Sequence, residues 1–324
     1  MTLLCAWLVL VVAGLLATGG RARRGSAVCL AATSTLVPLC VDGYPLLRVV
    51  AGIAAAAGLA RTVDLVREWP SRTRGARVLQ VLVVLDWRLA RPTPPRLDPD
   101  KALRTLGYAA ISAVAVLGTW AARTRGAPFL VGSLAAAVAI WSTAEWVSTL
   151  VRIFTECAGW SLPSLHDRPA ESKSLAELWG RRWNLTVTRW LHGAVFVPVA
   201  RRHGAKLGLL AAFLVSALFH AYMAYAGGGW ILALSMGSFF VVQAVLILVE
   251  RALRVTRWPA YAARVWMLAG MLLPSPLFTE PMVAVTAPAL SPLPPLTSCA
   301  CRLSGRRRLR SCHRRRSRAS SRRR

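Results

Sequence analysis

Long apolar runs constrain the fold of this chain more than any other feature. Stretches rich in Ala, Leu and Val recur from the N-terminus to about residue 285. A helix of about 20 residues matches the roughly 30 Å hydrocarbon core of a bilayer. Hydrophobic residues make up 55% of the chain and the mean hydropathy is +0.47. Because lipid cannot satisfy backbone polar groups, we expect an all-α, polytopic transmembrane helix bundle.

The pattern predicts about eight spans, all within a membrane domain that covers residues 1–286. A shorter apolar run, Val78 to Leu85, cannot cross a bilayer and is predicted to be re-entrant or interfacial. The first segment lacks an N-terminal basic region and is interpreted as a retained helix, not a signal peptide. The expected spans are Leu3 to Thr18, Ser26 to Val41, Tyr44 to Ala60, Leu103 to Ala122, Phe129 to Ile153, Lys206 to Ala226, Trp230 to Val249, and Tyr261 to Val285 with proline interruptions.

Basic loops predict an orientation in the membrane. Lys and Arg concentrate at residues 21–24, 61–101, 152–189 and 251–257, and such loops favour the cytoplasmic side. We therefore expect a multi-pass protein whose N-terminus lies outside and whose 152–189 loop is cytoplasmic. The loop with Arg123 and Arg125 then falls on the outer side, which breaks the pattern once.

The C-terminal residues 287–324 differ in composition from the rest. They are rich in Pro, Ser and Arg and have no apolar period, so we expect disorder. Twelve arginines lie between Arg302 and Arg324, and subtracting them from the net charge of +28 leaves +16 for the remaining loops. That distribution is typical of a membrane protein and predicts no nucleic-acid partner. The tail either contacts anionic lipid, has no specific role, or is an artefact of a shifted reading frame.

No metal site is expected. Cys299, Cys301, Cys312 and His313 are possible ligands, but their spacing is not a familiar zinc pattern and they fall in the segment expected to be disordered.

His220 is the most unusual residue of the predicted spans. It lies 14 residues after Lys206, about 21 Å along a helix, where an ionisable group is costly. Ser216 lies one turn earlier on the same helix face. A neutral imidazole there is a candidate general base. From spacing alone, a purely structural hydrogen-bonding role is equally compatible.

A polar and aromatic segment, SLAELWGRRWNLTV at residues 174–187, precedes this helix. Trp179 and Trp183 are expected at headgroup depth, with Arg181 and Arg182 directed toward phosphates or water. Asn184 follows them. Such a segment suits the reception of an anionic, amphipathic substrate.

Together, SLAELWGRRWNLTV and the later FLVSALFH resemble the membrane-bound O-acyltransferase family, and within it the wax synthase type. SPLFTEP at 275–281 is also similar to the end of that domain, which gives a wax synthase-like core of about 160–285. The resemblance implies acyl transfer from a long-chain acyl-CoA to a lipophilic alcohol, without a metal or redox cofactor.

The resemblance also implies roles for individual residues. His220 would be the catalytic base and Asn184 the second polar residue of an internal catalytic chamber. Trp179, Arg181, Arg182 and Trp183 would shape the acyl-CoA entrance, and Ser216 would lie beside the substrate. Members commonly carry an acidic residue after the histidine, whereas this chain has Ala221. Another group, Ser216 or a water, must then orient the imidazole.

Several alternatives remain open at this stage. The acceptor can be a fatty alcohol, a sterol or a glyceride, and the acyl-chain length and oligomeric state are not determined. A different class, a transporter or lipid-binding protein with His220 as a ligand or proton site, is also compatible. Among other polar residues, Glu145 is either a buried partner or a chamber residue, Gln243 is expected to bridge helices, and His166, His192 and His203 are expected to be solvated or inert.

Overall fold

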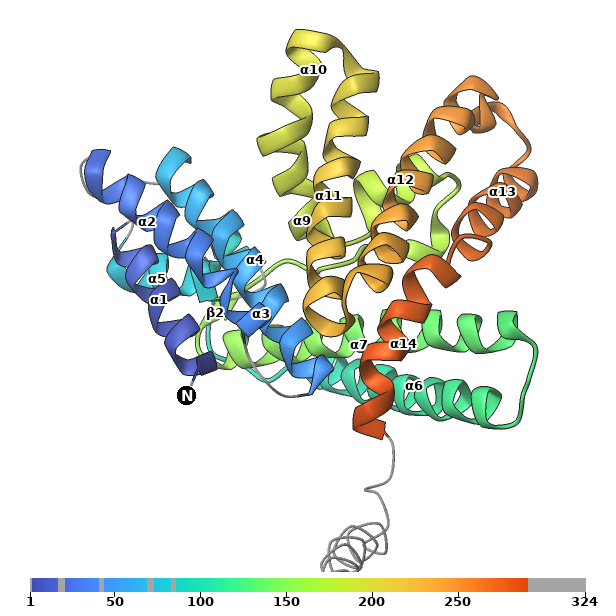
Figure 1. Cartoon of the computed structure of the whole chain (residues 1–324), viewed down its shortest axis with the longest axis horizontal. Helices are drawn as coiled ribbons and strands as arrows, with labels where there is room; N and C mark the ends of the chain where they lie inside the picture. Colours follow the sequence, from blue (N-terminus) through green and yellow to red (C-terminus); the bar gives the residue numbers. More distant parts are fainter. Residues whose placement is uncertain (1, 17–20, 41–43, 69–72, 83–85, 291–324) are drawn as a thin grey trace, which may run out of the picture. The chain divides into compact units, whose positions relative to one another are not determined.

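The computed structural model describes residues 2–16, 21–40, 44–68, 73–82 and 86–290. Helices make up almost all of these residues, so the predicted all-α bundle is confirmed (Figure 1). We describe the compact unit Met1–Thr286. The tail residues from Cys299 to His313 lie outside the described ranges, and the predicted boundary at residue 287 stays a prediction.

The helices of the first half precede the segment that carries the WGRRWN sequence. They are α1 (Thr2–Leu16), α2 (Arg21–Ser34), α3 (Val37–Cys40), α4 (Pro45–Glu68), α5 (Arg74–Leu82), η1 (Trp87–Leu89), α6 (Pro99–Thr124) and α7 (Phe129–Cys157). Two short strands, β1 (Arg91–Pro92) and β2 (Trp160–Ser161), pair antiparallel, with Arg91 opposite Ser161.

The second half begins with short helical turns and continues with long helices. Its elements are η2 (Pro169–Glu171), α8 (Leu175–Glu177), the π-helical turn η3 (Leu178–Arg182), α9 (Leu185–Leu191), the π-helical turn η4 (His192–Phe196), α10 (Val197–His203), α11 (Ala205–Gly228), α12 (Trp230–Ala252), η5 (Val255–Arg257), α13 (Ala260–Leu272) and α14 (Pro276–Leu290).

Within the described ranges, α4, α6, α7, α11 and α12 are long and apolar enough to cross a bilayer, and α13 with α14 makes a sixth span if this pair, bent by 42°, is counted as one. The expected count of about eight stays a prediction, since α1 and α2 border residues outside the described ranges. The described parts of these two helices have 15 and 14 residues. At 1.5 Å per residue each is about 22 Å long, which is shorter than the hydrocarbon core. α5 is also too short to cross, as expected for the run that begins at Val78.

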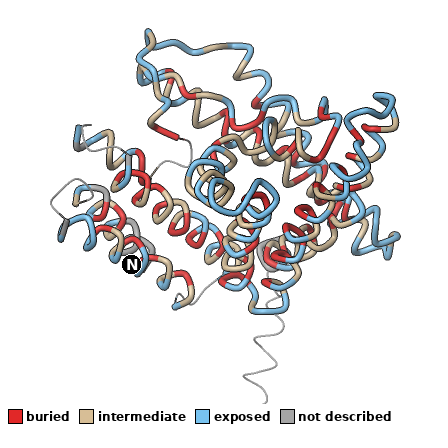
Figure 2. The backbone as a smooth tube through the Cα atoms, turned by 90° about the horizontal axis from the view of Figure 1, so that it is seen from above, coloured by how far each residue is buried: buried red, intermediate tan, exposed pale blue. Residues whose placement is uncertain are grey.

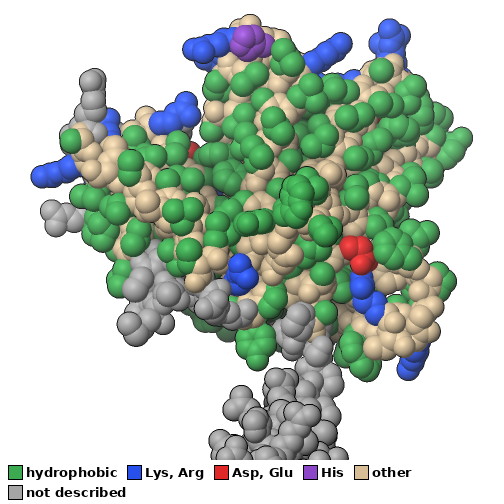
Figure 3. Space-filling view, viewed as in Figure 1, with side chains coloured by type: hydrophobic (Ala, Val, Ile, Leu, Met, Phe, Trp, Pro, Cys, Tyr) green, Lys and Arg blue, Asp and Glu red, His purple; other side chains and the backbone are tan. Residues whose placement is uncertain are grey.

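The α6 and α7 pair shows how the long helices suit lipid. On α6 the buried positions are small or polar, including Ser112, whose hydroxyl lies 2.6 Å from that of Thr143 on α7. The opposite face of α6 exposes large apolar side chains such as Leu103 and Val114. Exposed apolar side chains also cover much of the face seen in Figure 3, and buried positions alternate with exposed ones along the helices in Figure 2. Polar contacts inside and apolar side chains outside are typical of a bundle in a bilayer.

Helix α11 joins the two halves. Its Tyr222 hydroxyl donates to the carbonyl of Thr35, at 2.7 Å. Near its end Gly227 lies against Val49 of α4 and Val285 of α14, where an added Cβ would come within 2.6 and 2.8 Å of their methyl groups. Only glycine permits these three helices to approach so closely, so this contact fixes α4 and α14 on the helix that carries His220.

Candidate functional site

A cavity of about 380 Å³ lies among the helices of the second half and is closed on one side by α7. Most of its wall is apolar or aromatic. This composition is typical of sites that bury a lipophilic ligand and orient it with a few polar groups. The polar or ionisable side chains of the lining are Asn184, Thr188, His192, Ser216, His220, Arg251, Ser275 and Thr279.

His220 is held in one orientation by its own helix. Its Nδ1 lies 2.8 Å from the backbone carbonyl oxygen of Ser216, one turn earlier. Because a carbonyl oxygen can only accept a hydrogen bond, Nδ1 carries the proton and Nε2 keeps an unshared electron pair. A neutral imidazole with a free Nε2 is the form required of a general base.

Aromatic rings cover the imidazole. Phe240 of α12 stacks on it, with ring centroids 3.9 Å apart and an interplanar angle of 28°, and Phe278 of α14 lies 5.8 Å away. Phe239 in turn contacts both phenylalanines. His220 is thus fixed by an in-helix hydrogen bond and by packing, without a carboxylate partner in this wall.

The residue after the histidine lies at a close helix contact. Ala221 faces Gly237 of α12, where a Cβ added to the glycine would lie 3.3 Å from the Ala221 Cβ. The Ser216 carbonyl orients the imidazole. The sequence suggested Ser216 for this task, and its main chain carries it out.

Trp179 is the centre of the aromatic wall. Its indole N–H donates to Oε1 of Gln243 at 3.0 Å, and the amide of Gln243 donates to the carbonyl of Gly270 at 2.9 Å. Gln243 is fully buried and links η3, α12 and α13, so its expected bridging role is observed. The Trp179 ring also meets Phe213, Phe239 and Phe240 edge-on. These contacts fix one wall of the cavity.

The start of the WGRRWN segment is anchored by local capping. The Ser174 hydroxyl accepts from the backbone N–H of Glu177, and the Glu177 carboxylate accepts from that of Lys173. This exchange resembles a capping box. The buried Glu250 of α12 accepts hydrogen bonds from the N–H groups of Leu175 and Ala176 at 2.6 and 3.1 Å. A carboxylate at a helix N-terminus is favourable, and here it ties the segment to α12.

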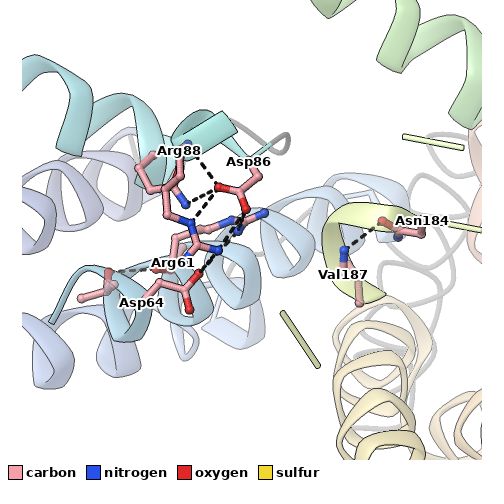
Figure 4. A network of polar contacts seen from close by, with 9 residues as sticks. Arg61, Asp64, Asp86, Arg88, Asn184 and Val187 are labelled. Atoms are coloured by element: carbon pink, nitrogen blue, oxygen red, sulfur yellow. Dashed lines mark hydrogen bonds and ion pairs between the residues drawn. The ribbon is translucent and has the colours of Figure 1, made fainter. Parts of the chain in front are cut away.

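Asn184 has a local structural task and lines the cavity as well. Its backbone is left-handed, with φ 40° and ψ 61°, a conformation that asparagine tolerates better than most residues. Its Oδ1 caps α9 by accepting from the N–H of Val187 at 3.3 Å (Figure 4). The cap fixes the side chain while leaving the amide nitrogen able to donate to a ligand.

The two predicted arginines do not line the cavity. Arg181 is exposed, beside the cavity-lining Gly180. Arg182 donates from Nε to Glu177 at 2.7 Å and from Nη1 to the carbonyls of Asp167 and Arg168 at 3.3 Å. The guanidinium therefore links three parts of this segment, and the predicted place of Arg182 at the substrate entrance stays a prediction.

The pair of Glu177 and Arg182 shows the expected mutual effect on ionisation. Partial burial raises the pKa of the Glu177 carboxyl, but hydrogen bonds from the Lys173 N–H and from Arg182 outweigh it, so this pKa lies below its usual value. The hydrogen bond to Glu177 raises the pKa of the Arg182 guanidinium. Both groups are charged at neutral pH.

Five polar lining residues have no predicted role in the site. They are Thr188, His192, Arg251, Ser275 and Thr279. His166, expected to be inert, is buried: its Nδ1 lies 3.2 Å from Glu145 Oε1 and its ring is 4.5 Å from that of Trp183. Glu145 is thus a buried neighbour of His166 and does not line the cavity. Its signal in the sequence was the carboxylate within an apolar span.

Comparison with known proteins now bears on the site. Residues 160–242 match the membrane bound O-acyl transferase family. The predicted resemblance to that family is confirmed. The chain is 33% identical over 112 residues to a probable long-chain-alcohol O-fatty-acyltransferase 2 of Arabidopsis thaliana, covering 31% of this chain and 32% of that protein. It is also 30% identical over 156 residues to a probable long-chain-alcohol O-fatty-acyltransferase 7 of Arabidopsis thaliana. That match covers 44% of this chain and 43% of that protein. The chain thus spans between a third and a half of the length of these relatives.

The acyltransferase match contains most of the cavity residues singled out above. Trp179, Asn184, Ser216 and His220 lie within it, whereas Arg251 and Thr279 follow it in the chain. With its apolar helices, the match makes this an integral membrane protein. Within the described ranges, no three His, Cys, Asp or Glu side chains lie close enough to hold a metal ion.

Proposed function

We propose that this protein transfers a long-chain acyl group from acyl-CoA to the hydroxyl of a lipophilic alcohol and so forms a wax ester. The observation that carries the proposal is His220 with Nδ1 bonded to Ser216 and Nε2 free, in the wall of an apolar cavity. The similarity to proteins named long-chain-alcohol O-fatty-acyltransferases supports the choice of donor and acceptor.

The proposed reaction needs one base and one hydrogen-bond donor. Nε2 of His220 takes the proton of the alcohol as its oxygen attacks the thioester carbonyl carbon. The tetrahedral intermediate then collapses, the carbon–sulfur bond breaks, and the imidazolium returns its proton to the leaving thiolate to give CoA. General-base assistance of this kind contributes on the order of 10²- to 10⁴-fold.

Asn184 is suited to the second task. Its amide nitrogen can donate to the carbonyl oxygen while negative charge develops there, and its Oδ1 bond to Val187 holds the side chain in place. A fixed donor costs no reorganisation when the charge forms, and this makes such donors effective in a cavity that excludes water.

The cavity suits two lipophilic substrates. The long chains of donor and acceptor would lie against the aromatic and aliphatic wall, and both already partition into the bilayer. The phosphates of CoA would meet the basic residues Arg251, at the cavity, and Arg181, at the surface, from the cytoplasmic side. Membrane lipid surrounds the exposed apolar faces of the spans.

The test is an acceptor panel with one acyl-CoA. Membranes that contain the protein are supplied with radiolabelled palmitoyl-CoA and, separately, with hexadecanol, a sterol or a diacylglycerol. We expect labelled ester with hexadecanol, and its loss in His220→Gln. The matched control is His203→Gln, since His203 is exposed at the end of α10, outside the cavity.

Each other result has a definite meaning. Ester from the sterol or glyceride alone would reassign the acceptor within the same superfamily. Full activity in His220→Gln would remove the proposed base. No ester from any acceptor would favour a membrane transporter or a lipid-binding protein that uses His220 as a ligand site.

A further inference from the structure

Thr279 of α14 is a buried hydroxyl without a protein partner. The residue is 2% exposed and lines the same cavity as His220. Its Oγ1 makes no hydrogen bond to any described residue. An unpaired polar group in such a place destabilises the protein, because it has lost water without gaining a partner. A group of this kind in a cavity wall is a candidate for pairing with a ligand.

The comparison with other helical threonines shows how unusual this is. A threonine in a helix commonly donates to the carbonyl one turn earlier. Thr62, Thr105, Thr119 and Thr149 all do so, at 2.8 Å. Thr286, two turns after Thr279 in the same helix, donates to Met282 at 2.9 Å. The hydroxyl of Thr279 forgoes the corresponding bond to Ser275, whose carbonyl instead accepts the backbone N–H groups of Phe278 and Thr279.

The neighbours of Thr279 on α14 contact other helices. The Leu277 carbonyl accepts from the Ser235 hydroxyl of α12 at 3.0 Å. The Glu280 carboxylate is paired with Arg123 of α6 and accepts from Ser133 of α7 at 3.5 Å. Phe278 contacts the His220 ring, which places this turn of α14 at the proposed reaction centre.

We infer that the Thr279 hydroxyl binds the hydroxyl oxygen of the acceptor alcohol and directs its O–H toward Nε2 of His220. The inference rests on the proposed function and adds a binding residue to it. An alcohol oxygen can accept one hydrogen bond while it donates another. Thr279 donates to this oxygen, His220 receives its proton, and one lone pair is left to attack the thioester.

The inference also bears on specificity. A hydrocarbon chain alone would leave Thr279 unpaired, whereas an alcohol satisfies it. A site with a buried group that must be paired discriminates against ligands that lack the matching atom. Thr279 would therefore separate long-chain alcohols from the apolar lipids that surround the protein.

The kinetic test replaces Thr279 with Val, which has the same shape without the hydroxyl, and with Ser, which keeps the hydroxyl. We expect Thr279→Val to lower kcat/KM for hexadecanol about tenfold while KM for acyl-CoA is unchanged, and Thr279→Ser to retain most of the activity. Because the hydroxyl has no partner in the free protein, Thr279→Val should keep or raise the melting temperature. The matched control is Thr286→Val, which removes a satisfied hydroxyl outside the cavity.

A binding measurement makes the test independent of turnover. Purified wild type should be stabilised against heat more by hexadecanol than by hexadecane, and Thr279→Val should respond to both alike. A protein that makes no ester can still lose the stronger stabilisation by hexadecanol in Thr279→Val. That result would support Thr279 as the alcohol-binding group and refute acyl transfer. Wild-type kcat/KM in Thr279→Val, or a wild type that does not distinguish hexadecanol from hexadecane, would overturn the inference.

Discussion

Two of the places where this protein buries polar side chains are built in opposite ways. Beside α4 and η1, a charge cluster of Arg61, Asp64, Asp86 and Arg88 brings together two guanidinium groups and two carboxylates (Figure 4). Arg61 contacts both carboxylates at 3.5 Å, and Arg88 contacts them at 3.1 and 2.9 Å. Gln80 donates to Asp86 as well. The formal charges of the four side chains cancel.

The cavity wall differs from the charge cluster in its polar groups. It contains no carboxylate, and two of its polar groups, Nε2 of His220 and the Thr279 hydroxyl, have no described protein partner. In the charge cluster, burial raises the pKa of the Asp86 carboxyl, but the hydrogen bond from Arg88 and the charge of Arg61 bring it below its usual value. Buried charges that pair with one another favour one fold, whereas polar groups without a protein partner are available to a ligand.

The largest effect should come from the cavity and should spare the fold. Replacing His220 with Gln removes the base, so ester formation is expected to fall on the order of 10²- to 10⁴-fold. Among the described residues, the imidazole makes its hydrogen bond within its own helix, so the melting temperature in detergent should change by a few degrees at most. A variant that unfolds would contradict the separation of roles between the two regions.

The charge cluster should give the converse result. Asp86→Asn leaves a buried positive charge uncompensated, and we expect the unfolding free energy to fall by about 3 to 5 kcal/mol. Thermal unfolding of the purified protein measures it, with the exposed Asp167→Asn as control. Activity per folded molecule should stay near wild type, and a selective loss of turnover at full stability would place the charge cluster in the reaction.

Trp179 allows a further comparison of the two regions. It belongs to the cavity wall, yet its indole N–H is hydrogen-bonded to Gln243. Trp179→Phe keeps the aromatic packing but leaves Oε1 of Gln243 without its donor, so we expect a loss of about 1 to 3 kcal/mol of stability. Trp230→Phe, at an exposed position, is the control. Equal melting temperatures for the two variants would show that the Gln243 bond does not hold the wall.

The smallest effect concerns the pair of Glu177 and Arg182 outside the spans. Because the pKa of Glu177 is lowered in the folded protein, its stabilisation is complete above its unfolded pKa, about 4.3, and is lost as the pH falls through the folded pKa. Solvent screens this partly exposed pair, so the effect should be the smallest of the four. Melting temperatures between pH 6 and 3 should fall more for wild type than for Glu177→Gln, and parallel curves would refute the coupling.

The sequence was informative where chemistry is local. The apolar runs predicted α6, α7, α11 and α12 within a few residues. The structure also brings to one cavity five residues that the sequence singled out: Trp179, Trp183, Asn184, Ser216 and His220. These residues follow from short motifs and from helix geometry, which depend little on the rest of the chain.

The remainder depends on contacts between distant segments. The sequence does not show that Arg182 is held by groups at residues 167, 168 and 177, because these residues meet only in three dimensions. Thr279 carries no signal of its own, since an unpaired hydroxyl is recognised only after all neighbouring donors and acceptors are placed.

The bond from His220 to its own helix limits the order of events in the proposed reaction. With Nδ1 occupied and a ring face covered by Phe240, a single nitrogen must both receive the proton of the alcohol and return it to the departing thiolate. Donor and acceptor must then be present together within reach of that one atom. Initial-rate plots should therefore intersect, as for a ternary complex, with no acyl-enzyme burst.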